Sequence, residues 1–244
     1  MADILLTRSP QNNSRFEALL RDQSWHGVIH KRPLLSAVGL QLSEGVKETI
    51  LKLDQYDKLI FISQNAVEFG MPMLETYWPQ WPVSLGWFSV GPATASKLEA
   101  FDIPVTFPEN ASSEGLLAIS SFQSPVDEKV LIVRGLGGRE LLKETLLSRG
   151  AVVDYLEVYE RRHVDYEGDF LGVSSDEVIA TLYSGEAILR LGELAKLSAM
   201  TFRLLVPTER LRVMAFDAGF DKVELAANQK DESMCESVLR MLDA

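Results

Sequence analysis

The stretch from Arg134 to Arg139, which reads Arg-Gly-Leu-Gly-Gly-Arg, combines three glycines with two cations and is well suited to hold a ligand. It follows a short apolar run and precedes an amphipathic helix predicted over residues 140–148. Glycine lets the backbone approach a ligand closely, and the unpaired N–H groups at the start of a helix attract anions. The stretch therefore predicts an anion-binding loop, although a tight strand-to-helix turn would use the same glycines.

Small hydroxyl and amide side chains follow other apolar runs in the same way. The segments are Ser63-Gln64-Asn65, Gly91-Pro92-Ala93-Thr94, Ser112-Ser113-Glu114-Gly115, Ser184-Gly185-Glu186 and Pro207-Thr208-Glu209. Each alone is an ordinary helix N-cap. As a set they would line the carboxyl ends of parallel strands, where open α/β sheets bind ligands. Many neutral donors beside few charged groups favour recognition of a polyanion through backbone N–H and hydroxyl groups.

Other familiar chemistries are missing from the sequence. Glu140 stands where the dinucleotide pattern Gly-x-Gly-x-x-Gly needs its last glycine, and no Gly-x-Ser-x-Gly elbow, Walker loop or protein-kinase signature occurs. His26 and His30 are four residues apart in a strand-like stretch, too far for one ion, so no metal site is predicted. The single cysteine, Cys235, excludes a disulfide framework and is predicted to pack in the core rather than to act as a nucleophile.

The elements that must position these residues alternate along the chain. Strands are predicted at Lys58–Ser63, Lys129–Arg134, Glu177–Thr181 and Phe202–Val206, and a helix-like segment follows each of them. Continuous apolar runs are typical of strands that are buried on both faces, and strand–helix alternation is typical of parallel sheets with crossover helices. The sequence therefore predicts an α/β fold.

An internal repeat divides the chain further. Gly91-Pro92-Ala93-Thr94 returns after 115 residues as Val206-Pro207-Thr208-Glu209, and each copy continues to a similar Ala-Phe-Asp. Residues 59–67 match residues 178–187, and residues 4–8 match residues 131–134. Three matching pairs in the same order predict two similar α/β domains.

The composition and charge of the chain exclude several classes of protein. The 244-residue chain has a formal net charge of −11, and 46% of its residues are hydrophobic, which is typical of a folded protein rather than a disordered one. Nucleic acid and anionic membranes are poor partners for such an acidic chain. No apolar run is long enough to span a membrane, and no secretory signal is recognisable, so we expect a cytoplasmic protein.

Taken together and in order, these segments resemble the uroporphyrinogen-III synthase family. The resemblance spans nearly the whole chain. It rests on Leu6-Thr7-Arg8, residues 61–67, Val90-Gly91-Pro92-Ala93-Thr94, residues 112–117, residues 133–139, Val158-Tyr159-Glu160-Arg161-Arg162, Ser184-Gly185-Glu186 and residues 207–211.

The resemblance implies two domains with doubly wound, flavodoxin-like parallel sheets flanked by helices. One domain would combine residues 1–35 with residues 166–244, and the other would be residues 41–157. The linkers near residues 33–40 and 158–165 would form a two-stranded β-ladder. The sequential repeat alone does not predict this crossing of the chain.

The resemblance also implies an activity and a set of residues. The protein would be a monomeric lyase that needs no cofactor and converts the small molecule hydroxymethylbilane to uroporphyrinogen III, with loss of water and inversion of ring D. Tyr159 would hydrogen-bond the departing hydroxyl, although a packed interface tyrosine is the alternative interpretation. The substrate-binding residues would be Arg8, Ser63, Asn65, Thr94, Ser113, Arg134, Gly135, Ser184, Gly185 and Thr208. The second Pro-Thr motif lacks the glycine of the first, which leaves open whether Thr208 or a neighbouring amide makes the contact.

Two other classes of function remain open on the sequence. A binding protein that closes on an anionic ligand without chemistry would show the same two halves. A nucleotide-dependent enzyme would use the Gly135 loop. Conversion of hydroxymethylbilane excludes the first class, and a thermal-shift screen with nucleotides would reveal the second.

Overall fold

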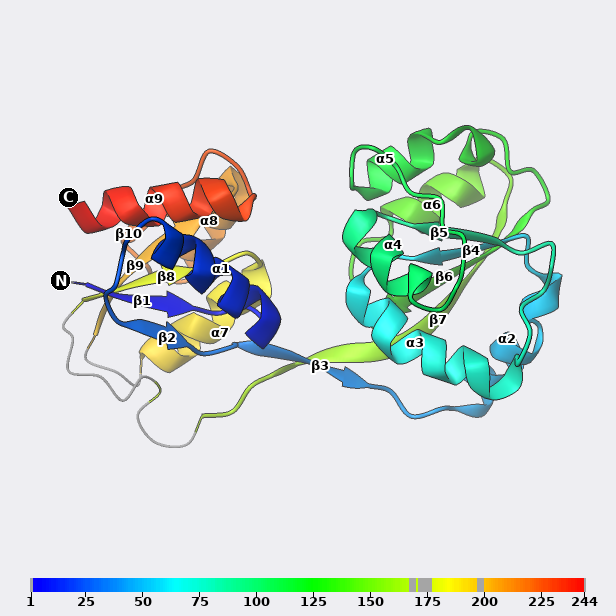
Figure 1. Cartoon of the computed structure of the whole chain (residues 1–244), viewed down its shortest axis with the longest axis horizontal. Coiled ribbons are helices and arrows are strands. Elements are labelled where there is room, and N and C mark those ends of the chain that lie inside the picture. The colour runs from blue at the N-terminus through cyan, green and yellow to red at the C-terminus, as the bar shows by residue number, and fades with distance from the viewer. Residues whose placement is uncertain (1, 167–169, 171–176, 197–199, 244) are drawn as a thin grey trace. The chain divides into compact units, whose positions relative to one another are not determined.

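The computed structural model describes residues 2–166, 170, 177–196 and 200–243. The chain forms two compact units, each with its own sheet of mainly parallel strands and its own helices (Figure 1). Unit 1 comprises Met1–Ser36 and Arg162–Ala244, and unit 2 comprises Ala37–Arg161. The predicted α/β class with parallel sheets flanked by helices is confirmed in both units.

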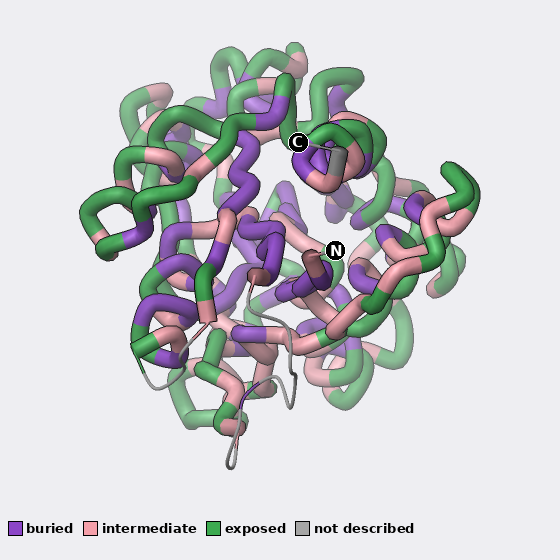
Figure 2. The backbone as a smooth tube through the Cα atoms, turned by 90° about the vertical axis from the view of Figure 1, so that its left-hand side faces the viewer, coloured by how far each residue is buried: buried purple, intermediate pink, exposed green. Residues whose placement is uncertain are grey.

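Unit 1 contains a five-stranded sheet in the order β10-β9-β8-β1-β2, and its strand pairs are parallel. Its strands are β1 (Asp3–Leu6), β2 (Ile29–Lys31), β8 (Glu177–Thr181), β9 (Thr201–Val206) and β10 (Lys222–Leu225), and its helices are α1 (Pro10–Asp22), α7 (Gly185–Ala195), α8 (Glu209–Asp217) and α9 (Asp231–Asp243). Helices α1 and α9 pack on one face of the sheet, and α7 and α8 pack on the other. In Figure 2 the buried stretches of the chain gather toward the inside, and exposed stretches lie around the outside.

Unit 2 has a similar sheet in the order β3-β7-β6-β4-β5, in which the pairs β7–β6, β6–β4 and β4–β5 are parallel. Strand β3 runs antiparallel to β7, because Leu40 donates to the carbonyl of Val158 and Val164 donates to that of Leu34. The strands of unit 2 are β3 (Leu35–Gly39), β4 (Lys58–Phe61), β5 (Gly86–Ser89), β6 (Lys129–Gly135) and β7 (Val152–His163). Its helices are α2 (Glu44–Leu51), α3 (Gln64–Tyr77), α4 (Pro92–Glu99), α5 (Ser113–Ala118) and α6 (Leu141–Ser148), with short 3₁₀ turns at Leu53–Gln55 and Ser120–Phe122. Helices α2, α3 and α4 cover one face, and α5 and α6 cover the other.

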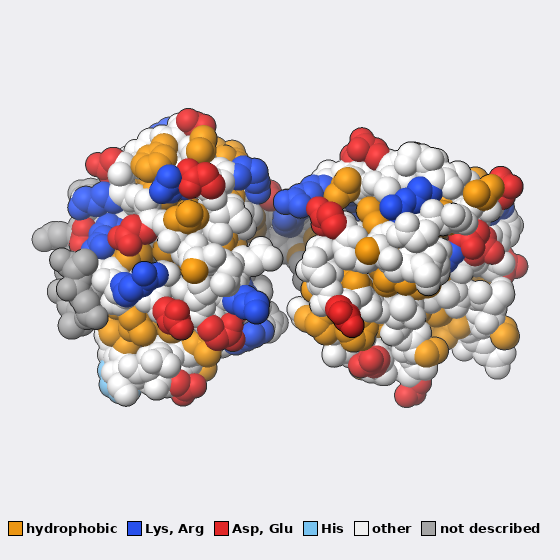
Figure 3. Space-filling view, turned by 90° about the horizontal axis from the view of Figure 1, so that it is seen from above, with side chains coloured by type: hydrophobic (Ala, Val, Ile, Leu, Met, Phe, Trp, Pro, Cys, Tyr) orange, Lys and Arg blue, Asp and Glu red, His pale blue; other side chains and the backbone are white. Residues whose placement is uncertain are grey.

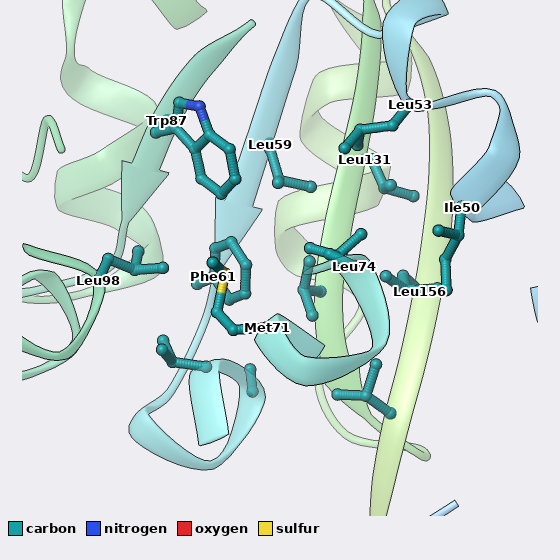
Figure 4. Packing of buried hydrophobic residues seen from close by; sticks show 14 of the residues in the cluster. Ile50, Leu53, Leu59, Phe61, Met71, Leu74, Trp87, Leu98, Leu131 and Leu156 are labelled. Carbon is teal, nitrogen blue, oxygen red and sulfur yellow. The ribbon is translucent and has the colours of Figure 1, made fainter. Parts of the chain in front are cut away.

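The strands read as continuous apolar runs because both of their faces are buried. In β4, Leu59 and Phe61 point to the face that α3 covers, and Phe61 lies beside Met71 of that helix (Figure 4). Ile60 belongs to the core on the opposite face, with α5 and α6. Successive side chains of a strand alternate between faces, so a sheet covered on both sides needs an apolar residue at each position. This pattern made β4, β6, β8 and β9 recognisable within two residues of their observed ends.

Hydroxyl side chains begin several of the helices that follow these strands. Each accepts a hydrogen bond from the backbone N–H three residues later: Ser63 from Ala66 at 3.1 Å, Ser112 from Gly115 at 2.9 Å, Ser184 from Ala187 at 3.3 Å and Thr208 from Leu211 at 3.4 Å. These bonds satisfy N–H groups that the helix itself leaves unpaired. The ordinary N-cap interpretation of the Ser and Thr segments is therefore correct for these four residues, and it leaves further N–H groups of each first turn to bind a ligand.

Cys235 lies in α9 and belongs to the core between that helix, α1 and β1. Its side chain is buried, and this burial is the main reason that the pKa of the thiol is raised to about 11. The prediction that it packs in the core is confirmed.

Alkylation of this thiol should therefore report the opening of unit 1. Only the thiolate reacts readily with iodoacetamide, and a buried thiol with a raised pKa is mostly protonated and shielded at pH 8. We expect slow alkylation of the native chain and rapid alkylation in denaturant, measured by mass spectrometry. Equal rates in the two conditions would contradict the buried position.

No helix in the described part of the chain is long and apolar enough to cross a membrane. On the face drawn in Figure 3, acidic and basic side chains alternate over both units. With a formal net charge of −11 the chain as a whole repels anions, so binding of an anion must depend on local groups.

Candidate functional site

Unit 2 contains a cavity of about 290 Å³ at the carboxyl ends of its strands. The lining includes the ends of β4, β6 and β7 and the loop that follows β6. The residues are Ile62, Val90, Ser112, Ser113, Ile132, Arg134, Gly135, Gly137, Gly138, Arg139, Leu142, Tyr155, Tyr159 and Arg161. The edge of the sheet predicted to bind a ligand is therefore hollowed in this unit, and its walls mix apolar side chains with arginine, serine and glycine.

Tyr159 lies on the wall of this cavity with its hydroxyl 3.2 Å from the hydroxyl of Ser63. Its ring is 7% exposed and stacks on Phe69 of α3, with 5.8 Å between the ring centroids. Gly135 lies against the same ring, because a Cβ atom built there would be 2.6 Å from the Cζ atom of Tyr159. The ring is thus held on two sides, and its hydroxyl is fixed beside the N-cap of α3.

A β-bulge brings Tyr159 to this place. The pairing of β7 with β6 runs in register from Val152 to Glu157 and then shifts, so that Gly135 pairs with Tyr159 instead of Val158. Strict alternation would put Tyr159 on the same face of the sheet as Tyr155. The extra residue instead places both Val158 and Tyr159 in the core under α3.

Arg134 is almost fully buried, and its guanidinium binds its own loop. The Nε atom donates to the carbonyl of Gly135 at 3.1 Å, one Nη atom donates to Glu140 Oε1 at 3.0 Å, and the other donates to the carbonyl of Gly137. The guanidinium also stacks 4.3 Å above the ring of Tyr155. Arg134 therefore lines the cavity with its cation already neutralised by Glu140.

Glu140 and Tyr155 form a short hydrogen bond at the rim of the cavity. The Tyr155 hydroxyl donates to Glu140 Oε2 at 2.6 Å. This bond is the main cause that holds the pKa of Glu140 below its ordinary value, and the ion pair with Arg134 acts in the same direction. Burial and the nearby carboxylate together raise the pKa of Tyr155 to about 12. At neutral pH the carboxylate is charged and the phenol is protonated, which suits both partners of the bond.

Unit 1 has a related arrangement after β1. Arg8 pairs with Asp231 at 2.6 Å and stacks 4.3 Å above the ring of Tyr183. The Tyr183 hydroxyl donates to Asp231 at 3.3 Å, and burial is the main reason that the pKa of this phenol is raised. An arginine, a tyrosine and a carboxylate thus meet at one strand end in each unit.

Three comparisons relate the chain to known proteins. The model of the family described as uroporphyrinogen-III synthase HemD matches residues 14–236. The chain belongs to the uroporphyrinogen-III synthase family. The uroporphyrinogen-III synthase of Salmonella typhimurium is 31% identical over 96% of this chain and 99% of its own length. That of Proteus mirabilis is 36% identical over 67% of this chain and 82% of its own length.

Solved structures of the same family share the fold. The uroporphyrinogen-III synthetase of Helicobacter pylori superposes with a TM-score of 0.64 at 16% identity, and the two chains cover each other almost completely. A mutant uroporphyrinogen III synthase of Thermus thermophilus gives a TM-score of 0.58 at 15% identity, with similar coverage. At this level of identity the agreement concerns the fold alone, and it confirms the predicted two-sheet α/β architecture.

The residues that the resemblance to this family singled out divide between the two units. Ser113, Arg134, Gly135 and Tyr159 line the cavity, and Ser63 contacts Tyr159. Asn65 and Thr94 lie in the first turns of α3 and α4 of the same unit, where Thr94 is buried. Arg8, Ser184, Gly185 and Thr208 lie at the carboxyl ends of β1, β8 and β9 in unit 1.

Several residues of the site were missed by sequence reasoning. Tyr155 and Glu140 were not singled out, and Arg139 was noted only as the end of the glycine loop. Tyr155 and Tyr159 have a spacing of four in a strand, which suggests one shared face and conceals the bulge. The opposite charges of Arg134 and Glu140, at the two ends of the glycine loop, were the signal in the sequence that an ion pair could close this loop.

The described residues contain no group of three or more His, Cys, Asp or Glu side chains placed to hold a metal ion. His30 binds Asp3 at 3.0 Å, so this histidine of the predicted strand-like stretch is part of a pair with a carboxylate. The polar groups at the cavity are instead hydroxyls, guanidinium groups and backbone N–H groups. Such groups bind carboxylates and hydrogen-bond a leaving hydroxyl.

Proposed function

We propose that the chain is a uroporphyrinogen-III synthase, a lyase that cyclises hydroxymethylbilane to uroporphyrinogen III in heme biosynthesis. The observation that carries this proposal is the family match, which extends over residues 14–236. Relatives that bear the same name align over 96% of the chain. The cavity of unit 2 supports the proposal because its groups suit a substrate that carries many carboxylates.

In the proposed reaction, the C–O bond to the hydroxyl of ring A breaks and the hydroxyl leaves as water, which gives an azafulvenium cation. Ring D then attacks through its substituted carbon and forms a spiro intermediate, which fragments and recloses with ring D inverted. The bilane also cyclises without an enzyme, so the protein must hold one conformation and favour one carbon as the nucleophile.

Tyr159 is the proposed donor to the departing hydroxyl. A buried hydroxyl held by Ser63 and by the packing of its ring is already oriented, so it loses little freedom when the leaving group develops charge. Its position in the wall of the cavity supports contact with a ligand there.

The carboxylates of the bilane are the proposed ligands of the helix starts at both sheets. Ser63, Asn65, Thr94, Ser113 and Gly135 of unit 2, with Arg8, Ser184, Gly185 and Thr208 of unit 1, are the proposed contacts. Most of these residues lie where N–H groups of a first helical turn have no intrahelical acceptor. Arg134 differs from this set because its guanidinium is engaged by Glu140 and by two carbonyls of its own loop.

We further propose that the two units act as domains with the boundaries 1–35 plus 166–244 and 41–157. The division of the chain after Ser36 and after Arg161 falls inside the proposed linkers at 33–40 and 158–165. Strands β3 and β7, which are neighbours in one sheet, contain both crossings and support a two-stranded connection. The protein is proposed to act as a cytoplasmic monomer without a cofactor.

The purified chain is expected to convert hydroxymethylbilane to isomer III, whereas spontaneous closure gives isomer I. Activity should persist in a chelator and without nucleotide, because the proposed mechanism uses only side chains and backbone N–H groups. The measurement is chromatographic separation of the oxidised porphyrin isomers, with heat-denatured protein as the control.

Three results would contradict this proposal. Formation of isomer I alone, with binding of the bilane retained, would favour a non-catalytic binding protein. Loss of activity in a chelator with recovery on one divalent ion would show a metal requirement. A nucleotide that stabilises the chain in a thermal-shift screen and is required for turnover would assign the Gly135 loop to a nucleotide.

A further inference from the structure

From the sequence, Arg134 is predicted to bind the substrate, but its hydrogen bonds in the structure indicate a different role. Its fork of N–H groups spans two carbonyls of the following loop, those of Gly135 and Gly137, and one carboxylate oxygen of Glu140. A guanidinium is planar and rigid, so three simultaneous hydrogen bonds fix the relative positions of the groups that accept them. The loop is therefore wrapped around the arginine.

This wrapping sets the direction of the peptide between Gly137 and Gly138. The peptide is trans, so its C=O and N–H groups point in opposite directions. Because the Gly137 carbonyl accepts from Arg134, the N–H of Gly138 points away from the guanidinium. Both glycines have positive φ, +72° and +103°, and both line the cavity. Positive φ is accessible to glycine at little cost, which explains the residue type at each position.

The Gly135–Leu136 peptide of the same loop obeys the same rule, and its N–H has an identified acceptor. The Gly135 carbonyl accepts from Arg134 Nε, and the N–H of Leu136 on the other side of that peptide donates to the carbonyl of Tyr159 at 2.7 Å. Arg134 thus also ties the loop to the strand that carries Tyr159.

The charge of Arg134 is balanced inside the protein. One carboxylate oxygen of Glu140 accepts from Arg134, and the other accepts from the Tyr155 hydroxyl at 2.6 Å. The ring of Tyr155 covers the guanidinium. Unit 1 has a comparable ion pair, in which Arg8 and Tyr183 both donate to one oxygen of Asp231, and Asp231 is only 6% exposed. The carbonyl bonds of its own loop are what distinguish Arg134.

We propose that Arg134 is a positioning residue, which holds the Gly137–Gly138 peptide so that the Gly138 N–H can bind a carboxylate of the substrate, while Glu140 and Tyr155 keep the guanidinium in place. This inference rests on the proposed function for the identity of the substrate. The carboxylate is bound equally before and during reaction, so loss of the arrangement raises KM and leaves kcat nearly unchanged.

Arg134→Lys and Glu140→Gln are the decisive variants. Lysine keeps the charge but cannot span two carbonyls and a carboxylate with one planar group, so KM should rise by about tenfold to a hundredfold, with kcat within about twofold. Glu140→Gln leaves one oxygen to serve both Arg134 and Tyr155, so KM should rise a few-fold. If Arg134 instead bound substrate directly, Arg134→Lys would keep much of the affinity and Glu140→Gln would lower KM by freeing the guanidinium.

A second readout needs no substrate. Hydrogen–deuterium exchange of the full chain, followed on peptides covering residues 135–140, should become at least about tenfold faster in Arg134→Lys. The loop carbonyls lose the donor that fixes them, so the Leu136 N–H is held less firmly on the carbonyl of Tyr159. Arg203→Lys is the matched control, since Arg203 also binds a carbonyl, that of Met241, and a carboxylate, that of Glu224, but lies in β9 of unit 1. It should change neither KM nor exchange in this loop.

The outcomes separate the inference from the proposed function. Unchanged exchange in Arg134→Lys, or a lower KM in Glu140→Gln, overturns the positioning role even in a fully active synthase. Absence of isomer III from the unmodified chain overturns the proposed function, and in that case the exchange experiment alone decides whether Arg134 organises the loop.

Discussion

Tyr159→Phe is expected to lower kcat for cyclisation of hydroxymethylbilane by about tenfold to a thousandfold, the range that one preorganised donor supplies. The substitution removes one hydroxyl that lies 3.2 Å from Ser63 and keeps the ring on Phe69. Because the ring supplies the packing, the fold should be retained. Steady-state kinetics with the isomer assay measure the effect, and thermal melts verify folding.

Single hydroxyl deletions elsewhere in the proposed site should be milder. Ser63→Ala, Thr94→Ala and Thr208→Ala each remove one side-chain contact, and Ser63 and Thr208 also cap a helix. Neighbouring backbone N–H groups would still hold the carboxylates, while loss of a cap costs about 1 kcal/mol of stability. Full activity in Tyr159→Phe would remove the tyrosine from the mechanism, and abolition of activity by one of the three deletions would contradict a distributed site.

The fold was predictable because its signals are local. Leu59, Ile60 and Phe61 face two covered sides of one sheet, so the strand reads as an unbroken apolar run. The helices that follow begin at Ser63, Ser184 and Thr208, whose capping bonds join residues three apart in the sequence. Periodicity and capping are properties of short windows, and a single sequence shows them.

The site was predictable only in outline. The carboxyl edge of a parallel sheet and the glycines after β6 indicated where a ligand would bind, and the cavity of unit 2 lies there. The partners of the arginines could not be predicted, because Arg8 pairs with Asp231, which is 223 residues away. Arg134 and Glu140 are close in sequence, but their pairing depends on the positive φ values of Gly137 and Gly138.

The position of Tyr159 also depends on a feature that single-sequence patterns do not reveal. One extra residue in β7 changes the face on which Tyr159 lies, and no residue type near Val158 announces a bulge. The only sign of the bulge in the sequence is the small residue opposite it, Gly135. Gly135 pairs with Tyr159, and glycine in a strand often marks a close approach of another group.

Gly135→Ala tests this close approach and should lower kcat about as much as Tyr159→Phe does. The new Cβ atom would lie 2.6 Å from Cζ and 2.7 Å from Cε2 of Tyr159. The ring cannot move freely because Phe69 stacks on its other side. The hydroxyl must therefore shift from its place beside Ser63, and a displacement of about 1 Å can lower the rate about a hundredfold. Overpacking should also cost about 1–3 kcal/mol of stability.

A matched control and a double variant separate a displaced hydroxyl from general damage. In Gly45→Ala, the new Cβ meets no atom of the described residues within 4 Å, and alanine favours helix α2 by about 1 kcal/mol, so activity should be unchanged. If Gly135→Ala acts through the tyrosine hydroxyl, the double variant with Tyr159→Phe should be about as slow as Gly135→Ala alone, because the two changes affect one interaction. Rate losses that multiply in the double variant, or a fully active Gly135→Ala, would show that the hydroxyl does not depend on this contact.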